Sequence, residues 1–295
     1  MSETIRTYYA QQYATNIALL SQQKTSRLSG AVRIEPVKGK AASPVEQLAA
    51  TSAKKRTSRY DPIQPDNQLT DRPWVYPTDY DWDDLIDQAD KLRLLVDPQS
   101  SYVMNGTAAM NRAKDDEIIA AFFSDRKTGE NGSDSTPFLP ANVVPVGTGA
   151  SAPTGLNVAK LRAGKKLLMA ADIDLESEEI YCAVTAAQHD NLLGEIQVIS
   201  TDFNDKPVLV DGKVTRFLGI NFIHTERLPV NGSTQRRNPL WVKSGMCLGV
   251  WNDIETDVTQ RKDLRGHPWQ VYLQGTFGGT RLEEKKVVEM PCVEA

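Results

Sequence analysis

The fold is decided by one stretch, residues 82–124, which reads WDDLIDQADKLRLLVDPQSSYVMNGTAAMNRAKDDEIIAAFFS. Asp97 can cap free backbone N–H groups at a helix start, and Pro98 suits the first turn, where its missing N–H is not needed. No further proline and only one glycine, Gly106, occur before Gly129. As a helix, residues 98–123 would extend about 39 Å, whereas a mean helix has about 11–12 residues. We therefore predict one long spine helix over residues 98–123, which the rest of the chain crosses.

One face of this helix carries small side chains, so we expect another segment to pack close to its backbone. The residues of that face are Tyr102, Gly106, Ala109, Ala113 and Ala120. On another face, Arg112 and Asp116 are spaced i, i+4 and are expected to form an ion pair. Apolar residues surround the helix near Phe122, which predicts a buried C-terminal end.

The composition is that of an ordinary globular chain, large enough for one or two domains: 295 residues, 40% apolar and 24% charged. No apolar run approaches the roughly 18 residues of a membrane span. The first ten residues, MSETIRTYYA, lack the apolar segment of a signal peptide. The three cysteines, Cys182, Cys247 and Cys292, are odd in number and far apart, which favours buried thiols in a reducing compartment.

The net charge of −4 conceals an asymmetry along the chain. Residues 1–60 hold 10 Lys and Arg against three Glu, a net charge of +7, whereas residues 61–295 have a net charge of −11. The basic part is either a solvated tail, or an arm that lies on an acidic surface of a neighbouring copy or faces nucleic acid.

The N-terminal quarter has few apolar anchors. A short amphipathic helix is expected around Tyr8 to Leu20, where apolar residues follow a helical period. Residues 29–75 begin with a strand-like VRIEPV and are then polar and Lys-rich, which fits either a disordered linker or a long two-stranded loop. Such a loop would have arms of about 15–20 residues and would need a partner to lie on, because an isolated hairpin is marginal in water.

Six aspartates gather between Tyr76 and Asp90. A carboxylate cluster can bind a cation, but aromatic and aliphatic residues are interleaved here and no EF-hand glycine is present. We therefore predict a short capped helix with a solvated acidic face.

The remaining chain alternates apolar runs with turn residues. The first expected elements are a polar loop at 125–142, a strand at 143–146 and a helix at about 156–171 capped by Thr154 or Asn157. They are followed by a strand at 180–184, a helix at 186–193 between Thr185 and Gly194, a hairpin turn at Asp211-Gly212 and a polar loop at 230–238. The last are strands at 241–250 and 254–258 and closing strands from Val271 to Met290, with a break at Gly275, Gly278 and Gly279.

No strong catalytic or ligand-binding motif is present. The loop Gly147 to Gly155 lies between a strand and a helix, as phosphate-cradling loops do, but Ala152 replaces the third glycine and no Lys-Ser/Thr follows. The three histidines, His189, His224 and His267, are isolated, and His189-Asp190 is expected to face solvent. We therefore predict no enzyme activity and no catalytic, cofactor-binding or metal-binding residues.

Taken together, the segments of residues 70–295 resemble the major capsid protein of tailed bacteriophages, in a group found among short-tailed phages. The resemblance lies in the spine-helix stretch and, in order, in LNVAKLRAGKKLLMAADI, YCAVTAAQHDNLLG, TRFLGINFIHTERLP, KSGMCLGVWNDIETDVTQRKD and TRLEEKKVVEM. These motifs are structural, so their number and order carry the resemblance.

The resemblance implies an α+β fold, the tailed-phage major capsid fold. Its parts would be an N-terminal arm (1–28), an extended β-hairpin loop across a neighbouring subunit (29–75), a peripheral domain with the spine helix (76–150), an axial domain (151–255) and return strands of the peripheral domain (256–295). It implies a structural protein that self-assembles into pentamers and hexamers of an icosahedral head around double-stranded DNA.

The implied partners are further copies of the chain, a scaffolding protein, a portal protein, a cement protein on the outside, and weak non-specific contact with packaged DNA, with no membrane. Assembly would take place in the host cytoplasm and the product would be the virion capsid. The arm is too short for a cleaved scaffolding segment, which favours a separate scaffolding protein. No motif identifies the Asn partner of a Lys–Asn cross-link, so that chemistry is not inferred. The alternatives are a compartment shell protein of the same fold and a nucleotide-binding α/β enzyme using Gly147 to Gly155.

Overall fold

A computed structural model describes residues 20–55, 58–60, 65, 68–86, 99–150, 152–195, 198, 214–232 and 234–294. The chain divides into two compact units. Unit 1 is Met1–Ser26, Asp79–Ala113 and Asn252–Thr276, and unit 2 is Arg27–Thr78, Lys114–Trp251 and Phe277–Ala295. The expected N-terminal helix and the hairpin turn at Asp211-Gly212 lie outside the described residues. Within the described part of the chain, no helix is long and apolar enough to cross a membrane.

The elements alternate along the chain, and strands predominate towards its C-terminal end. They are η2 (Ser29–Ala31), β1 (Arg33–Pro36), β2 (Gln47–Leu48), β3 (Thr70–Asp71), β4 (Thr78–Ile86), α2 (Gln99–Phe123), β5 (Arg126–Thr128), β6 (Asp134–Thr136), η3 (Pro140–Asn142), α3 (Val158–Ala170), β7 (Ile180–Val184), α4 (Ala186–Leu193), β8 (Arg216–Phe217), β9 (Ile220–His224), β10 (Gln235–Val242), η5 (Lys243–Gly245), β11 (Met246–Gln260), β12 (Trp269–Arg281), η6 (Glu284–Lys286) and β13 (Val287–Val293).

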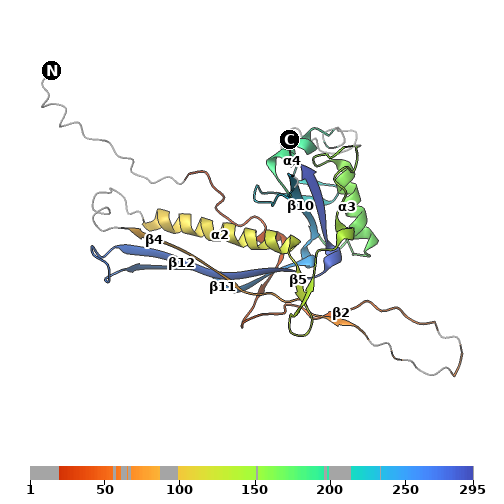
Figure 1. Cartoon of the computed structure of the whole chain (residues 1–295), viewed down its shortest axis with the longest axis horizontal. Helices are drawn as coiled ribbons and strands as arrows, with labels where there is room; N and C mark the ends of the chain where they lie inside the picture. Colours follow the sequence, from red (N-terminus) through yellow and green to blue (C-terminus); the bar gives the residue numbers. More distant parts are fainter. Residues whose placement is uncertain are drawn as a thin grey trace, which may run out of the picture. The chain divides into compact units, whose positions relative to one another are not determined.

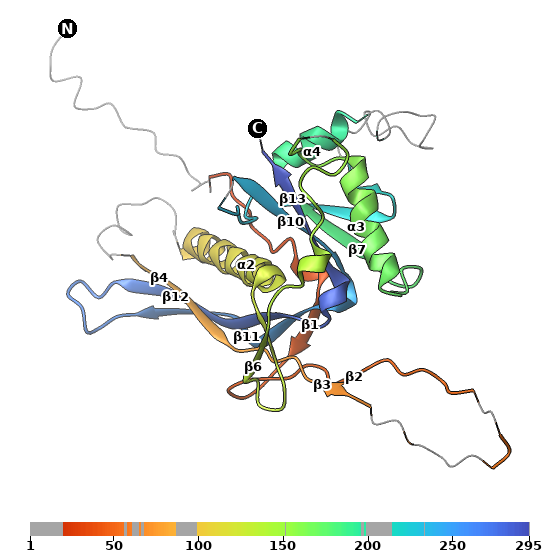
Figure 2. The same ribbon diagram turned by 45° about the vertical axis from the view of Figure 1, so that its right-hand side comes forward.

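The spine helix is confirmed as α2, which ends at Phe123 as predicted. Its close packing is also confirmed: a Cβ on Gly106 would lie 2.5 Å from a ring carbon of Trp82 and 2.7 Å from Leu273 Cδ1. Within unit 1, the N-terminal half of α2 lies along β4 and β12 (Figures 1 and 2). A residue without a side chain is needed at this point because the helix and the strands share the same space.

The buried face of α2 differs in part from the predicted one, since Ala109 and Ala113 are half-buried and Ala120 is exposed. The buried residues are Ser101, Gly106, Ala108, Met110, Asp115, Ile118, Ile119, Ala121 and Phe122. The predicted Arg112–Asp116 ion pair is wrong. Arg112 donates to Gln22 Oε1 at 2.8 Å, and Asp116 instead binds the Arg227 guanidinium through Nε at 2.6 Å. Contacts with residues distant in the sequence therefore determine the partners of Arg112 and Asp116, and their i, i+4 spacing does not.

Replacing Gly106 by valine is expected to lower the free energy of unfolding by about 1–3 kcal/mol, because the added carbons overlap Trp82 and Leu273 in a packed interior. The change is measured as the shift of the urea midpoint. Gly30→Val is the matched control, because a Cβ there meets nothing within 4 Å. Equal midpoints for the two variants would contradict the packing of α2 described above.

The acidic stretch after Tyr76 forms strand β4, so the predicted short helix is wrong for the residues described there. Alternate residues Tyr80, Trp82 and Asp84 are half-buried and Ile86 is buried, whereas the aspartates between them are exposed. Trp82, Leu85 and Ile86 also satisfy a helical spacing, but β4 pairs with β12 at the edge of a four-stranded sheet of order β1-β11-β12-β4. Pairing with a strand distant in sequence decides between the two periods.

The closing strands are longer and more continuous than predicted. Residues 246–260 form the single strand β11, and the expected loop at 230–238 contributes its last four residues to β10. Strand β12 passes uninterrupted through the glycines expected to break it. A Cβ on Gly279 would lie 2.7 Å from Ala121 Cβ and 2.9 Å from the Glu117 carbonyl oxygen. Glycine is required there by the close approach of α2, and not by a bend.

Unit 2 also contains a five-stranded sheet of order β13-β10-β7-β9-β8, with α3 and α4 beside it (Figures 1 and 2). The predictions for this region are largely confirmed: β7 has its expected bounds, Asn157 caps α3 by accepting from Lys160 N at 2.8 Å, and Thr185 precedes α4. Leu161, Leu168, Leu240 and Met290 belong to its core. Strand β13 pairs with β10, so this part of residues 256–295 belongs to the five-stranded sheet.

A carboxylate ties the end of this sheet to α4. Glu294 Oε2 accepts from Arg236 Nε at 2.9 Å and Nη2 at 2.7 Å, and Oε1 accepts from Thr185 Oγ1 at 2.6 Å and from Gln188 Nε2 at 3.1 Å. The Arg236 hydrogen bond lowers the pKa of Glu294 below its ordinary value of 4.5. The folded state therefore binds fewer protons at this group than the unfolded chain does, and the resulting stability is present above about pH 4.5 and lost as the pH falls through the lowered pKa.

Replacing Glu294 by glutamine is expected to lower the free energy of unfolding at pH 7 by about 2 kcal/mol, because charged hydrogen bonds are lost. The difference from the wild type should shrink as the pH falls below about 4, where the wild-type carboxylate becomes protonated. Urea unfolding between pH 3 and 7 checks this. A difference that stays constant over that range would show that the charge of Glu294 is not the stabilising feature.

The extended segment 29–75 is confirmed as two-stranded only near its base. Strand β1 pairs in parallel with β11, so residues 33–36 belong to a sheet and not to the loop. Beyond them, Ala42 bridges Val75 and β2 pairs with β3, so the pairing seen among the described residues is shorter than the predicted 15–20 residues. Every described residue from Leu48 to Thr70 is exposed, including Tyr60 at 92%. The described residues of this outer loop, residues 48–70, therefore form no core of their own.

Candidate functional site

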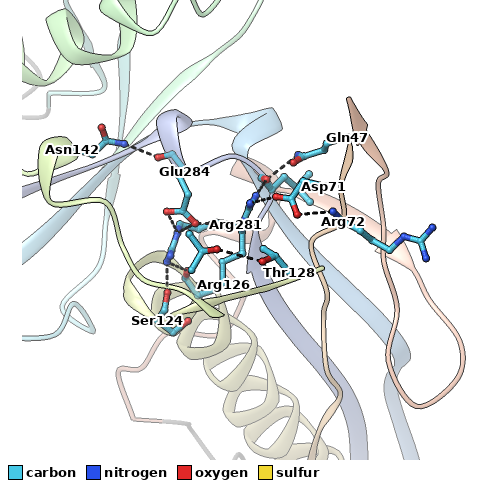
Figure 3. Close-up of polar contacts among 12 residues, drawn as sticks. Gln47, Asp71, Arg72, Ser124, Arg126, Thr128, Asn142, Arg281 and Glu284 are labelled. Carbon is cyan, nitrogen blue, oxygen red and sulfur yellow. Dashed lines mark hydrogen bonds and ion pairs between the residues drawn. The ribbon is translucent and has the colours of Figure 1, made fainter. Parts of the chain in front are cut away.

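A polar junction in unit 2 lies where the extended loop, the C-terminal end of α2 and the end of β12 meet (Figure 3). Its centre is Arg281, the last residue of β12, which is 1% exposed. Arg281 Nη1 donates to the carbonyl oxygens of Ala121 at 3.1 Å, Phe122 at 2.9 Å and Ser124. The last carbonyls of a helix carry partial negative charge and have no partner within the helix, so a guanidinium stabilises them.

A second arginine connects the junction to the base of the loop. Arg126, which begins β5, binds the Asp71 carboxylate on β3 through Nη2 and the Leu282 carbonyl oxygen through Nη1. Leu282 O also accepts from Gln47 Nε2 of β2 at 2.8 Å, so both strands of the loop base are held (Figure 3). The loop is thereby fastened to the body on both arms.

Glu284 balances the charge of the two arginines. It accepts from Arg281 Nε at 3.0 Å and lies 3.5 Å from Arg126 Nε, so two guanidiniums face the carboxylates of Glu284 and Asp71. The Glu284 carbonyl oxygen accepts from Asn142 Nδ2 at 2.7 Å. The charges of Arg281, Arg126 and Glu284 are nearly buried, and buried charges are tolerated only when they are paired in this way.

Sequence reasoning missed this junction. Arg281, Arg126 and Asp71 are far apart in the chain, and only Arg281 and Glu284 are close, at i, i+3. The available signal was a single arginine ending the apolar run before Leu282, an environment in which a charge needs a partner.

The described residues of the loop Gly147 to Gly155 are held by hydrogen bonds from the helix that follows. The capping Asn157 donates through Nδ2 to the Thr148 carbonyl oxygen at 2.9 Å, so the helix N-terminus is already closed. The buried Lys160 amine donates to the carbonyl oxygens of Thr154 at 2.7 Å and Pro291 at 2.9 Å. These contacts fix the loop against β13.

The other candidate residues remain separate. His189 is half-buried, contrary to the solvent-facing position predicted, and its Nε2 accepts from Val214 N at 3.0 Å. His224 Nε2 lies 2.9 Å from Glu226 Oε1, an exposed contact. Among the described residues, no group of three His, Cys, Asp or Glu could hold a metal ion.

The three cysteines are buried free thiols, as predicted. Burial raises the pKa of Cys247 to about 12 and that of Cys292 to about 11, and it raises the pKa of Cys182 as well. These thiols stay protonated at neutral pH, and a protonated thiol is a poor nucleophile.

Comparison with solved structures places the fold among phage capsid subunits. The chain is similar to the capsid of cyanophage P-SCSP1u, with 13% identity, a TM-score of 0.77 and coverage of 99% of this chain and 95% of that one. It is also similar to the cyanophage Pam1 capsid, with 12% identity, a TM-score of 0.77 and coverage of 98% of this chain and 97% of that one. For the capsid of a native GTA particle the identity is 15%, the TM-score is 0.70, and the coverage is 99% of this chain and 97% of that one. At such low identity the likeness defines the fold alone.

The family is shown by the sequence. Residues 5–294 match the family described as Phage capsid protein, so the chain belongs to that family. It is a major capsid protein of a bacteriophage, a structural component of the virion and not an enzyme. No curated protein shows a significant match to the sequence.

Proposed function

We propose that this protein assembles into the pentamers and hexamers of an icosahedral phage head that encloses double-stranded DNA, in a phage with a short tail. Family membership over residues 5–294 supports the capsid role. The observation that carries the assembly proposal is the outer part of the extended loop, whose described residues are all exposed although Leu48 and Leu69 are apolar. Apolar side chains held away from any core need a partner surface.

Each of the expected segments is assigned one role in the proposed shell. Residues 1–28 serve as an arm, the outer loop within 29–75 lies across a neighbouring subunit, and the spine helix strengthens a peripheral domain (76–150). Residues 151–255 form an axial domain around the five-fold and six-fold axes. Of residues 256–295, β13 joins the axial sheet because it pairs with β10, and β12 serves the peripheral domain.

The proposed partners are further copies, a separate scaffolding protein, the portal protein and a cement protein, with assembly in the host cytoplasm. Contact with packaged DNA is weak and sequence-blind, because phosphate contacts add up along the polymer and a net charge of −4 limits them.

Electron microscopy of the purified protein tests the proposal, with the protein expressed alone and together with the proteins encoded beside its gene. Closed shells or hexamer rings are expected in at least the second preparation. Dispersed monomers in every preparation would contradict it.

A further inference from the structure

Helix α3 carries an exposed cationic groove. Its lining consists of Arg162, Lys165, Lys166, Met169, Ala170 and Leu218, and its volume is about 440 Å³. The three cations lie at i, i+3 and i+4 on one side of the helix, and no acidic residue lines the groove. The floor is partly apolar, since Met169 is 60% exposed.

The groove is a built feature. Lys165 Nζ donates to the Leu218 carbonyl oxygen at 2.8 Å, which ties α3 to the turn between β8 and β9. In that turn Leu218 and Gly219 both have positive φ, 53° and 80°. A leucine rarely adopts this conformation, so the lysine stabilises a turn that forms one wall of the groove.

The cations of this groove have no anionic partner within the described chain. None of Arg162, Lys165 and Lys166 forms an ion pair with a described residue, although the chain has a net charge of −4. A local gathering of unmatched positive charge on an acidic protein favours an acidic partner surface.

The same unit carries a matching set of unpaired carboxylates. The segment after α3, residues 172–179, contains five acidic residues. Glu178 is paired with Lys286, and Glu179 accepts a hydrogen bond from Tyr181. Asp172, Asp174 and Glu176 are exposed and have no cationic partner among the described residues. Ile173 and Leu175, which alternate with these acids, pack against the core of the same unit, so the three carboxylates are held on its surface.

We propose that the groove of α3 binds the acidic segment 172–179 of a second copy of this chain, which rests on the proposed assembly into shells. Three unmatched cations and three unmatched carboxylates then neutralise each other between copies. Packaged DNA is the less suitable partner, because phosphate contacts need no exposed methionine and tight binding repeated over many copies would immobilise the genome.

Charge reversal tests this pairing. Arg162→Glu together with Lys166→Glu is expected to lower the yield of shells about tenfold or more, since like charges then face each other. Asp174→Lys with Glu176→Lys should do the same, and the four substitutions combined should restore shells. Arg265→Glu with Lys262→Glu is the matched control, because it reverses one exposed arginine and one exposed lysine in unit 1, outside the groove and the acidic segment. A cooperative thermal unfolding transition confirms that each variant is folded. If the glutamate variant of the basic side is unfolded, Arg162→Gln with Lys166→Gln is used in its place.

The outcomes separate this inference from the proposed function. Wild-type protein that forms no shells would contradict both. Wild-type shells together with unaffected charge-reversed variants, or with impaired variants that the combination does not restore, would overturn the pairing alone. Normal shells that lose packaged DNA when the basic side is reversed would assign the groove to DNA and overturn the proposal.

Discussion

Replacing Arg281 by methionine is expected to lower the free energy of unfolding by about 3–5 kcal/mol, because it removes one partner of a buried ion pair. The guanidinium is 1% exposed, and its removal leaves Glu284 without its closest cation and the carbonyls of Ala121 and Phe122 without a donor. Methionine fills most of the volume, so the loss reports the polar contacts and not a cavity. Urea unfolding is the measurement.

Two further variants give this prediction its controls. Arg261→Met removes an arginine whose pairing with Asp263 is exposed, at 41% and 58%, and exposed pairs are worth at most about 1 kcal/mol. Arg281→Lys keeps the positive charge, but an ammonium group lacks the planar guanidinium that reaches several acceptors at once. This variant should therefore retain only part of the free energy of unfolding that Arg281 contributes. If Arg281→Met and Arg261→Met had the same effect, the junction would not stabilise the fold.

Removing the outer loop is expected to abolish shell formation while the body stays folded. Residues 50–68 would be replaced by a short Gly-Asn-Gly turn. This replacement keeps the hydrogen bond that Ala49 N donates to the Leu69 carbonyl oxygen at 2.8 Å. The deletion starts after β1 and Gln47, because both belong to the body's hydrogen-bond network. The thermal midpoint should be unchanged, because every described residue removed is exposed.

A matched variant separates the length of the loop from its side chains. It replaces residues 50–68 with a Gly/Ser segment of equal length, and it should also fail to close shells if side chains such as Tyr60 make the contact. Electron microscopy and thermal unfolding are the two measurements. Normal shells from the shortened protein would show that the loop is not an assembly element, and an unfolded body would show that it belongs to the core.

Elements governed by local signals could be predicted from the sequence. The spine helix is long and free of internal proline, α3 has its Asn157 cap, and β7 is an apolar run followed by the Thr185 cap of α4. The order of these segments also indicated the capsid family. Each of these features depends on residues a few positions apart, so no tertiary information is needed to find them.

Only the tertiary structure decided the features that depend on distant residues. Strand β4 satisfies both a helical and an alternating pattern, and its pairing with β12 selects the strand. Two of the glycines that look like a break in β12, Gly278 and Gly279, are the places where Tyr76 and α2 approach the strand. The junction links Asp71 to Arg126, and it links both Arg126 and Arg281 to Glu284, so the two buried guanidiniums find their partners only when the chain folds. Caps and periodicity act along the chain and can be read from it, whereas strand pairing and buried charge act across space.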